Sequence, residues 1–451
     1  MSVVTTSSGT APAAGSQAGA GAGATGAPGS AFRTADRPRW EDYSRCIHCG
    51  LCLEACPTFR LLGEEMDSPR GRIYQVAQAD AGRLPLAGAL ETHIGRCLDC
   101  RACETACPSG VEYGKILERT RAELAAQRHA RGGGGRLANY VFQKLLPRPQ
   151  TMARQARWLR FYQRSGLRTL ARESGALRLL GLAGAEALAP EIEGAFFAAE
   201  MGQTFPARGP RRARVAFLAG CVQRVAFAEM NRATLRVLQA AGCEVVVPAA
   251  QGCCGALHVH AGRREEARGL ARANLAAFAG FEAVVTNSAG CGSALKEYGD
   301  LLESEAGAEF AGRVKDATEL LAALGVPAGM LGPLPIAVTY QDPCHLAHGQ
   351  RIRSAPRQLL AAVPGLELRE MERADSCCGS AGIYNLVQAD IAGRLLEEKM
   401  GHIAATRVDT IVTANPGCML QLRAGLRRSG QAGRVVHVME LLDESLERAG
   451  R

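Results

Sequence analysis

The hydrophobic pattern of the N-terminal part of the chain is helical wherever cysteines are sparse. Apolar residues recur at helical spacing over residues 71–84 and again over residues 114–130. Eight cysteines fall within residues 34–125, in two runs that flank the first of these helical stretches. The pattern therefore predicts an α-helical domain built around its cysteines.

The C-terminal half has a different pattern, in which short apolar runs alternate with helical stretches. Two such runs occur in each of two consecutive segments, and a helical stretch follows the second run of each pair. The strand-like runs cover residues 212–220, 282–290, 335–340 and 409–417. Alternating strand and helix signals predict two α/β units with parallel strand pairing.

The cysteines of this half mark an internal repeat. Each α/β unit has one cysteine, then an adjacent pair followed by glycine, then a fourth cysteine. The corresponding positions lie 123 residues apart at the first cysteine, 124 at the pair and 127 at the last. The cysteines are Cys221, Cys253, Cys254 and Cys291 in the first unit, and Cys344, Cys377, Cys378 and Cys418 in the second.

The single cysteines of each unit follow predicted strands: Cys221, Cys291 and Cys418 do so directly and Cys344 closely. Ligands of open α/β sheets lie beyond the carboxyl ends of strands. Four thiolates per unit are therefore candidates for a further iron–sulfur cluster or a redox site. A purely structural role is the alternative. Glycine after the pair would let the backbone approach a bulky ligand. Cys243 lies outside the pattern and is expected to be a buried apolar residue.

Several residues near these cysteines are weaker candidates. His258, His260 and His345 are expected to make ordinary hydrogen bonds rather than to act as ligands or proton relays. Lys296 is expected to be solvated on a helix, and contact with an anion near the site is the alternative.

Composition excludes some classes of protein. The chain has 451 residues, enough for roughly two to four domains. No run of about 18 apolar residues lacks a charge, so no transmembrane helix is expected. Seventeen cysteines without a secretory-signal pattern indicate metal ligation in a reducing compartment, and we expect a cytoplasmic protein. Residues 1–33 form an Ala/Gly-rich tail that is expected to be disordered.

The net charge of +9 is concentrated in one segment. Residues 127–176 carry eleven Lys or Arg and one acidic residue, Glu173. Five arginines recur at helical spacing and are predicted to share one helix face: Arg154, Arg157, Arg160, Arg164 and Arg168. That face is either solvated or a contact with an anionic membrane surface or an acidic partner. Because no nucleic-acid-binding motif accompanies the charge, no nucleic-acid partner is expected.

The N-terminal cysteines form the most specific motif in the chain. The spacing C-x2-C-x2-C-x3-C-P occurs twice and is that of bacterial two-cluster ferredoxins, in which the fourth cysteine ligates the other cluster. The predicted ligands of cluster 1 are therefore Cys46, Cys49, Cys52 and Cys107. Those of cluster 2 are Cys56, Cys97, Cys100 and Cys103.

Taken together, the motifs resemble a known family. CIHCGLCLEACP, SPRGRIY, LAGCVQ, QGCCGA and SCCGSAGIYNL are similar to the iron–sulfur subunit of bacterial glycolate oxidase, also called glycolate dehydrogenase. The resemblance covers about residues 40–445. The paired-cysteine units also occur in subunits of heterodisulfide reductase, anaerobic glycerol-3-phosphate dehydrogenase and lactate utilisation systems. In the wider pattern each unit ends in CxxC, whereas Ser288 and Asn415 stand at those positions here.

The resemblance implies a division of labour. FAD-containing partner subunits would oxidise glycolate to glyoxylate, and this chain would carry electrons through two [4Fe-4S] clusters towards a membrane acceptor, the quinone pool. It would then be cytoplasmic or peripheral at the inner face of the cell membrane. A related lactate or glycerol-3-phosphate dehydrogenase is one alternative. A self-contained redox enzyme like heterodisulfide reductase is another.

The predicted fold is therefore multidomain, with an α-helical ferredoxin domain followed by two tandem α/β Cys-Cys-Gly units. After the tail, the predicted parts are the ferredoxin domain at residues 34–125, a basic helical linker at 126–212, the first α/β unit at 213–330 and the second at 331–451.

Overall fold

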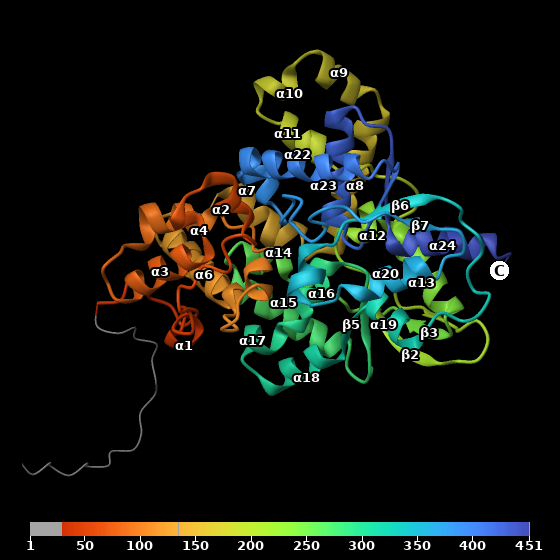
Figure 1. Cartoon of the computed structure of the whole chain (residues 1–451), viewed down its shortest axis with the longest axis horizontal. Helices are drawn as coiled ribbons and strands as arrows, with labels where there is room; N and C mark the ends of the chain where they lie inside the picture. The colour runs from red at the N-terminus through yellow and green to blue at the C-terminus, as the bar shows by residue number, and fades with distance from the viewer. Residues whose placement is uncertain (1–28, 134, 451) are drawn as a thin grey trace, which may run out of the picture.

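The computed structural model describes residues 29–133 and 135–450 (Figure 1). A helical N-terminal region is followed by a group of linker helices and then by two β-sheets with their covering helices. This order confirms the predicted fold class. Residues 1–28 of the predicted tail lie outside the described residues.

The N-terminal region is made of short helices whose starts are set by local sequence. Pro57 and Pro69 stand at the first positions of two of them, where proline costs no hydrogen bond, and Ser68 caps the second by accepting from the Gly71 N–H. The elements are α1 (Trp40–Tyr43), α2 (Pro57–Leu62), η1 (Glu65–Asp67), α3 (Pro69–Asp80), η2 (Leu86–Leu90), α4 (Glu91–Gly95), α5 (Ala102–Thr105) and α6 (Tyr113–Ala130).

The core of this region includes the end of the predicted tail. Phe32, the only aromatic residue of the first 33, is fully buried in the same core as Ile73 and Leu117. The backbone N–H groups of Arg33 and Thr34 donate to the Glu123 carboxylate at 2.9 and 2.6 Å. The described residues just before the predicted boundary at residue 33 thus pack with the N-terminal region, because burial of Phe32 favours an ordered chain there.

The linker helices do not form the single basic face that the sequence predicted. They are α7 (Arg136–Tyr140), η3 (Val141–Leu145), α8 (Pro149–Arg164), α9 (Leu167–Glu173), α10 (Ala176–Leu179) and α11 (Ala183–Leu188). Gly166 has a φ of 80° and ends the first long helix, so Arg168 belongs to α9 rather than to α8. Among the described residues, no helix is long and apolar enough to cross a membrane.

The four parallel strands of each sheet share one topology, and the first sheet adds the antiparallel strand β1 at its edge. The first has the strand order β1-β3-β2-β4-β5 and the second the order β7-β6-β8-β9. The strands are β1 (Thr204–Phe205), β2 (Ala213–Leu218), β3 (Cys243–Val246), β4 (Val284–Thr286), β5 (Val314–Asp316), β6 (Ala337–Tyr340), β7 (Glu367–Leu368), β8 (Thr410–Thr413) and β9 (Arg434–His437). All pairs are parallel except β1–β3. The parallel pairing and the internal repeat are thus confirmed.

Two element positions differ from the predicted boundaries. Strand β1 pairs with β3 through Phe205 and Val245, so the first sheet begins before residue 213. Helix α6 continues through residue 125, where the ferredoxin domain was predicted to end. Both differences arise because pairing and packing partners, rather than composition, decide where an element belongs.

Helices cover both sheets, and the two units share one core. The helices of the first unit are α12 (Gln223–Ala226), α13 (Ala228–Ala240), α14 (Ala256–His260), α15 (Arg264–Ala277), α16 (Ala289–Lys296), α17 (Tyr298–Leu302), α18 (Glu305–Arg313) and α19 (Ala317–Leu324). Those of the second are η4 (His345–Gly349), α20 (Ser354–Ala361), α21 (Tyr384–Val387), α22 (Ala389–Ala405), α23 (Pro416–Ser429) and α24 (Val438–Arg448). Phe217 and Val285 of the first sheet lie in the same buried cluster as Val338 and Val412 of the second. The units therefore pack as one body.

The N-terminus of α24 carries a buried histidine cap that makes stability depend on pH. His437 Nδ1 accepts from the Met439 N–H at 3.1 Å, and burial lowers the pKa of this histidine to about 4. Between pH 6.5 and 4 the unfolded chain binds a proton here that the folded chain does not. The contribution of His437 to the free energy of unfolding is therefore fully present above about pH 6.5. The free energy of unfolding should fall by about 1–3 kcal/mol as the pH drops to about 4.

Urea unfolding of the wild type and His437→Asn at about pH 7 and 4.5 measures this effect. Asparagine keeps a capping acceptor but does not titrate, so the variant should lose this part of the pH dependence. Identical pH dependence in the two proteins would contradict the assignment.

Candidate iron–sulfur centres

The two N-terminal cysteine loops have the same backbone conformation. His48 and Gly50 in the first loop are left-handed, with φ of 54° and 85°. Asp99 and Arg101 occupy the corresponding positions of the second loop, with φ of 58° and 62°. Such turns direct successive N–H groups towards an anion, and the Asp99 N–H lies 3.5 Å from Cys97 Sγ. Both loops are therefore shaped to surround a negatively charged group.

The four cysteines predicted for cluster 2 line one pocket. They are Cys56, Cys97, Cys100 and Cys103. Cys56 comes from the first motif, so the fold does bring it to the three cysteines of the second. The buried Arg72 guanidinium lies 4.0 Å from Cys56 Sγ and 3.2 Å from the Asp67 carboxylate. Four thiols beside a buried cation form a donor set that fits an iron–sulfur cluster.

The cysteines predicted for cluster 1 lie nearer to the surface. Cys49 is exposed, whereas Cys46, Cys52 and Cys107 are half-buried. Burial raises the pKa of the Cys46 thiol, and the charges of Cys107 and Cys49 raise it further. Burial likewise raises the pKa of Cys52 to about 11. The structure thus places Cys107 of the second motif beside the first motif, while ligation itself stays a prediction.

Each α/β unit brings its four cysteines together beyond the carboxyl ends of its central strands. Neighbouring thiols in chain order shift one another's pKa, so their sulfurs lie close together. They run Cys221–Cys253–Cys254–Cys291 in the first unit and Cys344–Cys377–Cys378–Cys418 in the second. The hydrogen bond with Cys221 lowers the pKa of Cys253, and that with Cys377 lowers the pKa of Cys344. We call these groups the first and second quartets.

The glycine after each cysteine pair has a backbone role that the sequence analysis did not identify. Gly255 and Gly379 are left-handed, with φ of 85° and 87°. A Cβ on Gly379 would also lie 2.6 Å from the Ala392 carbonyl oxygen of α22. These glycines therefore permit the turn and, in the second unit, close helix packing.

Ser288 and Asn415 lie between the two quartets. Ser288 Oγ and Asn415 Oδ1 are 3.3 Å apart, and Asn415 Nδ2 donates to Cys418 Sγ at 3.4 Å. The positions that hold a fifth thiol in the wider pattern thus form a polar contact across the two units. Within each quartet, four sulfurs remain for a metal centre.

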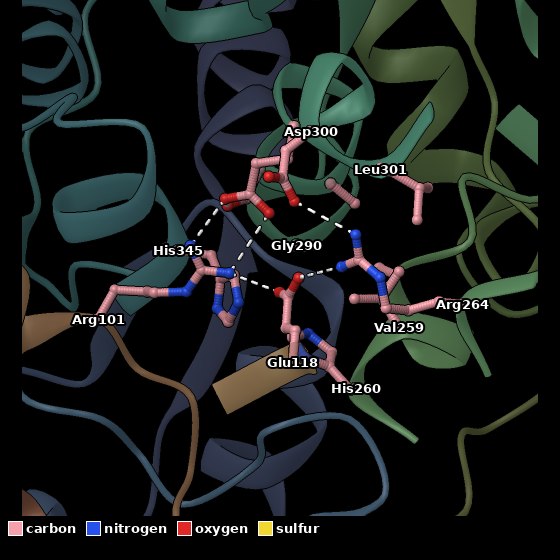
Figure 2. A pocket seen from close by; sticks show the side chains of 13 residues that line it. Arg101, Glu118, Val259, His260, Arg264, Gly290, Asp300, Leu301 and His345 are labelled. Atoms are coloured by element: carbon pink, nitrogen blue, oxygen red, sulfur yellow. Dashed lines mark hydrogen bonds and ion pairs between the residues drawn. The ribbon is translucent and has the colours of Figure 1, made fainter. Parts of the chain in front are cut away.

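A buried charge network joins the second N-terminal loop to the first α/β unit (Figure 2). Arg101 donates to Asp99 at 2.9 Å, to Glu118 of α6 at 2.6 Å and to Glu297 of the first unit at 2.8 Å. Burial raises the pKa of Glu118 to about 8, and the charge of Arg101 opposes this shift. Arg101, Glu118 and Glu297 were missed in the sequence because their partners come from distant segments.

Two histidines complete this junction. His260 Nδ1 lies 2.9 Å from the Asp99 carboxylate, and its ring meets that of His345 edge-on at 5.2 Å. His258 Nε2 lies 2.8 Å from the Phe142 carbonyl oxygen.

Lys296 pairs with Glu319 at 2.8 Å and so does not face an anion at the quartets. Cys243 is fully buried in the shared apolar core.

The five predicted contact arginines divide into two groups. Arg160 donates to the Ile192 and Gly194 carbonyls at 3.2 and 2.7 Å, and Arg168 pairs with Glu186 and Glu191 at 2.7 and 2.6 Å. Both therefore hold the linker together. The exposed members are Arg154, Arg157 and Arg164.

The fold and the cysteine sites define an iron–sulfur protein with a two-cluster ferredoxin region and two cysteine-rich units. Family models agree: a 4Fe-4S dicluster domain matches residues 42–111, and a cysteine-rich domain matches residues 215–296 and 338–423. The linker-region model of the glycolate oxidase iron–sulfur subunit matches residues 134–189. The chain belongs to the family of glycolate oxidase iron–sulfur subunits, and its dicluster domain carries two [4Fe-4S] clusters.

Individual relatives support this assignment. The probable glycolate oxidase iron–sulfur subunit of Bacillus subtilis is 42% identical over 90% of this chain and 94% of its own length. The glycolate oxidase iron–sulfur subunit of Escherichia coli is 33% identical over 89% and 94%. Lactate utilization protein A of Oceanobacillus iheyensis is 30% identical over 52% of this chain and 98% of its own length.

Loss of the Arg101 guanidinium should be costly because it would leave buried carboxylates without their partner. Arg101→Gln should lower the free energy of unfolding by about 3–5 kcal/mol. Arg128→Gln is the control, because Arg128 is exposed where it pairs with Glu91, and it should cost less than about 1 kcal/mol. Urea unfolding of the two variants measures the difference. Equal costs would show that the junction does not depend on this network.

Proposed function

We propose that this chain carries electrons from FAD-containing partner subunits, which oxidise glycolate to glyoxylate, towards a membrane quinone. The observation that carries this proposal is the graded burial of the cysteine sites. The predicted cluster 1 ligands reach the surface, the cluster 2 ligands are buried, and the second quartet adjoins them. Sites arranged from the surface inwards suit a conduit for electrons.

The surface around Cys49 is suited to meet the electron-donating partner. Ile47 and Leu51 flank this exposed cysteine, and they are 69% and 62% exposed. Apolar side chains beside a redox centre can exclude water from a contact with another protein. We assign Cys46, Cys49, Cys52 and Cys107 to cluster 1, which would receive electrons here. Bound [4Fe-4S] clusters exchange single electrons and so divide a two-electron flavin oxidation into two steps.

The second quartet lies directly against the cluster 2 cysteines. Cys100, Cys344 and Cys377 belong to one buried cluster. Burial raises the pKa of Cys100, and Cys344 is the first of the charged neighbours that raise it further. Tyr384 lies in the same cluster, and its hydroxyl donates to the Arg96 carbonyl at 2.7 Å.

We therefore assign Cys56, Cys97, Cys100 and Cys103 to cluster 2. We further assign an additional iron–sulfur cluster to the second quartet, Cys344, Cys377, Cys378 and Cys418. The first quartet, Cys221, Cys253, Cys254 and Cys291, has the same donor set and is kept as a second candidate metal or redox site. Its Cys254 and Cys291 belong to a separate buried cluster.

Cys49→Ser tests the conduit. In the assembled complex this change should abolish reduction of a quinone analogue while glycolate still bleaches the flavin, because the substrate is oxidised in another subunit. Stopped-flow absorbance follows both steps. Ser44→Ala, at another exposed residue close in the sequence, is the control and should reduce the quinone analogue normally. Loss of flavin bleaching in assembled Cys49→Ser complex would refute a pure conduit role.

The repeat offers matched variants for the second quartet. Cys377→Ser should remove about four irons per chain and leave the roughly eight irons of the ferredoxin clusters. Cys253→Ser is the equivalent change in the first quartet. Iron analysis and electron paramagnetic resonance of anaerobically purified protein measure the losses. Unchanged iron in Cys377→Ser would refute a cluster at the second quartet.

Lactate is a second candidate substrate for the complex. The observation that favours it is the similarity to lactate utilization protein A over about half of this chain. Adding glycolate, lactate or glycerol-3-phosphate to the same complex, and following cluster bleaching, distinguishes these substrates. Bleaching by glycolate alone would exclude lactate.

Dithiol or disulfide turnover by the isolated chain would instead support the heterodisulfide-reductase-like alternative.

A further inference from the structure

The long linker helix α8 has an outer face that the protein itself does not cover. Its inner face centres on Ala156, which packs against Ile192 and Val225. At about 100° per residue, Arg154, Trp158 and Phe161 project within about 40° of the opposite direction. Trp158 and Phe161 are 64% and 55% exposed and contact each other edge-on at 6.2 Å. Trp158 and Phe161 thus point away from the protein on the same side of α8 as Arg154.

The next two helices extend this surface. Helix α9 packs on α8 and on α10, and α9 and α10 stand at the top of the view, away from both sheets (Figure 1). Leu170 of α9 and Leu180, just after α10, are well exposed, and Leu179 is 90% exposed. We call the exposed apolar and arginine side chains on and just beside α8 to α10 the linker surface: Arg154, Arg157, Trp158, Phe161, Arg164, Leu167, Leu170, Arg172, Arg178, Leu179 and Leu180.

The charge of this surface is almost entirely positive. Residues 149–182 contain seven arginines and one acidic residue, Glu173. Arg160, Arg168 and Arg172 make internal contacts, Arg172 through an ion pair with Glu186 at 2.9 Å, whereas Arg154, Arg157 and Arg164 are exposed at or beside the aromatic pair. An apolar surface with arginines around it complements an interface that is apolar inside and anionic outside.

We propose that the linker surface docks the chain onto the anionic surface of a lipid bilayer. Trp158 and Phe161 would enter the boundary between headgroups and acyl chains, where amphipathic aromatic rings are favoured. The exposed arginines would pair with anionic headgroups, each contributing about a fivefold gain in binding. This proposal rests on the proposed function, in which electrons leave towards a membrane acceptor, and it names the surface that holds the chain there.

Lipid suits this surface better than an acidic protein does. The apolar residues lie on or just beside three separate helices, and leucines are interspersed with arginines along the sequence. A bilayer accepts such a spread because it needs no matching shape. An acidic protein partner is the competing occupant, and the experiment separates the two.

Intrinsic fluorescence gives a direct test because the chain has only two tryptophans. Trp40→Phe removes the one on α1 and leaves Trp158 as the reporter. The full chain with its clusters is mixed with vesicles of phosphatidylcholine containing about 30% phosphatidylglycerol, or of phosphatidylcholine alone. We expect a blue shift and quenching by brominated acyl chains with anionic vesicles only, weakening as salt is added. No binding to anionic vesicles would overturn the proposal.

Variants test which residues act. Trp158→Ser with Phe161→Ser, and separately Arg154→Gln with Arg164→Gln, should each lower vesicle binding at least tenfold in sedimentation assays. The control is Leu386→Ser with Arg272→Gln, at exposed positions of other elements, and it should bind normally. Normal vesicle binding by both linker variants would overturn the proposal. The proposal would also be overturned if the linker variants lost partner subunits from the purified complex while their vesicle binding was unchanged. That result would make this surface a protein interface.

Failure of docking can be separated from failure of the proposed function. Reduction of a soluble dye by glycolate needs the electron path but no membrane. The linker variants should therefore reduce the dye at the wild-type rate, yet transfer electrons to quinone in vesicles at least tenfold more slowly. If a linker variant no longer binds the vesicles but still reduces their quinone at the wild-type rate, docking has no role in electron transfer.

Discussion

The second cysteine loop is held in place by one buried guanidinium. Arg101 has a left-handed backbone between Cys100 and Cys103, and its side chain satisfies carboxylates from the loop itself, from α6 and from the first α/β unit. A non-glycine residue in this conformation costs energy, which the ion pairs offset. The same interaction therefore shapes a candidate cluster loop and joins the N-terminal region to the rest of the molecule (Figure 2).

Duplication gives the chain two quartets, and their neighbours make them different. The four parallel strands of the two units have one order, and the cysteines of each unit follow one another in the same sequence. The second quartet packs into the cluster that contains Cys100, whereas Cys254 and Cys291 of the first lie in another cluster. One repeat can thus extend a redox path while its equivalent has another role, because electron transfer depends on proximity rather than on ligand type.

The two proposed contact surfaces lie on different elements. The Cys49 loop belongs to the N-terminal region, and the aromatic and basic surface belongs to the linker helices. A partner protein and a bilayer could then be engaged at the same time. The Gly166 break matters here, because it turns α9 away from the axis of α8 and assigns Arg168 to internal ion pairs. A continuous helix would have presented that arginine to solvent.

The sequence alone determined the local and periodic features. Cysteine spacing indicated the two-cluster motif, and apolar runs at a constant offset predicted the repeated parallel sheets, since both depend only on residues close together in the chain. Tertiary structure decided the burial of Phe32, the internal use of Arg160 and Arg168, and the network around Arg101. It also decided which quartet adjoins Cys100. These outcomes depend on residues that are distant in sequence and meet only when the regions pack, so no local pattern could encode them.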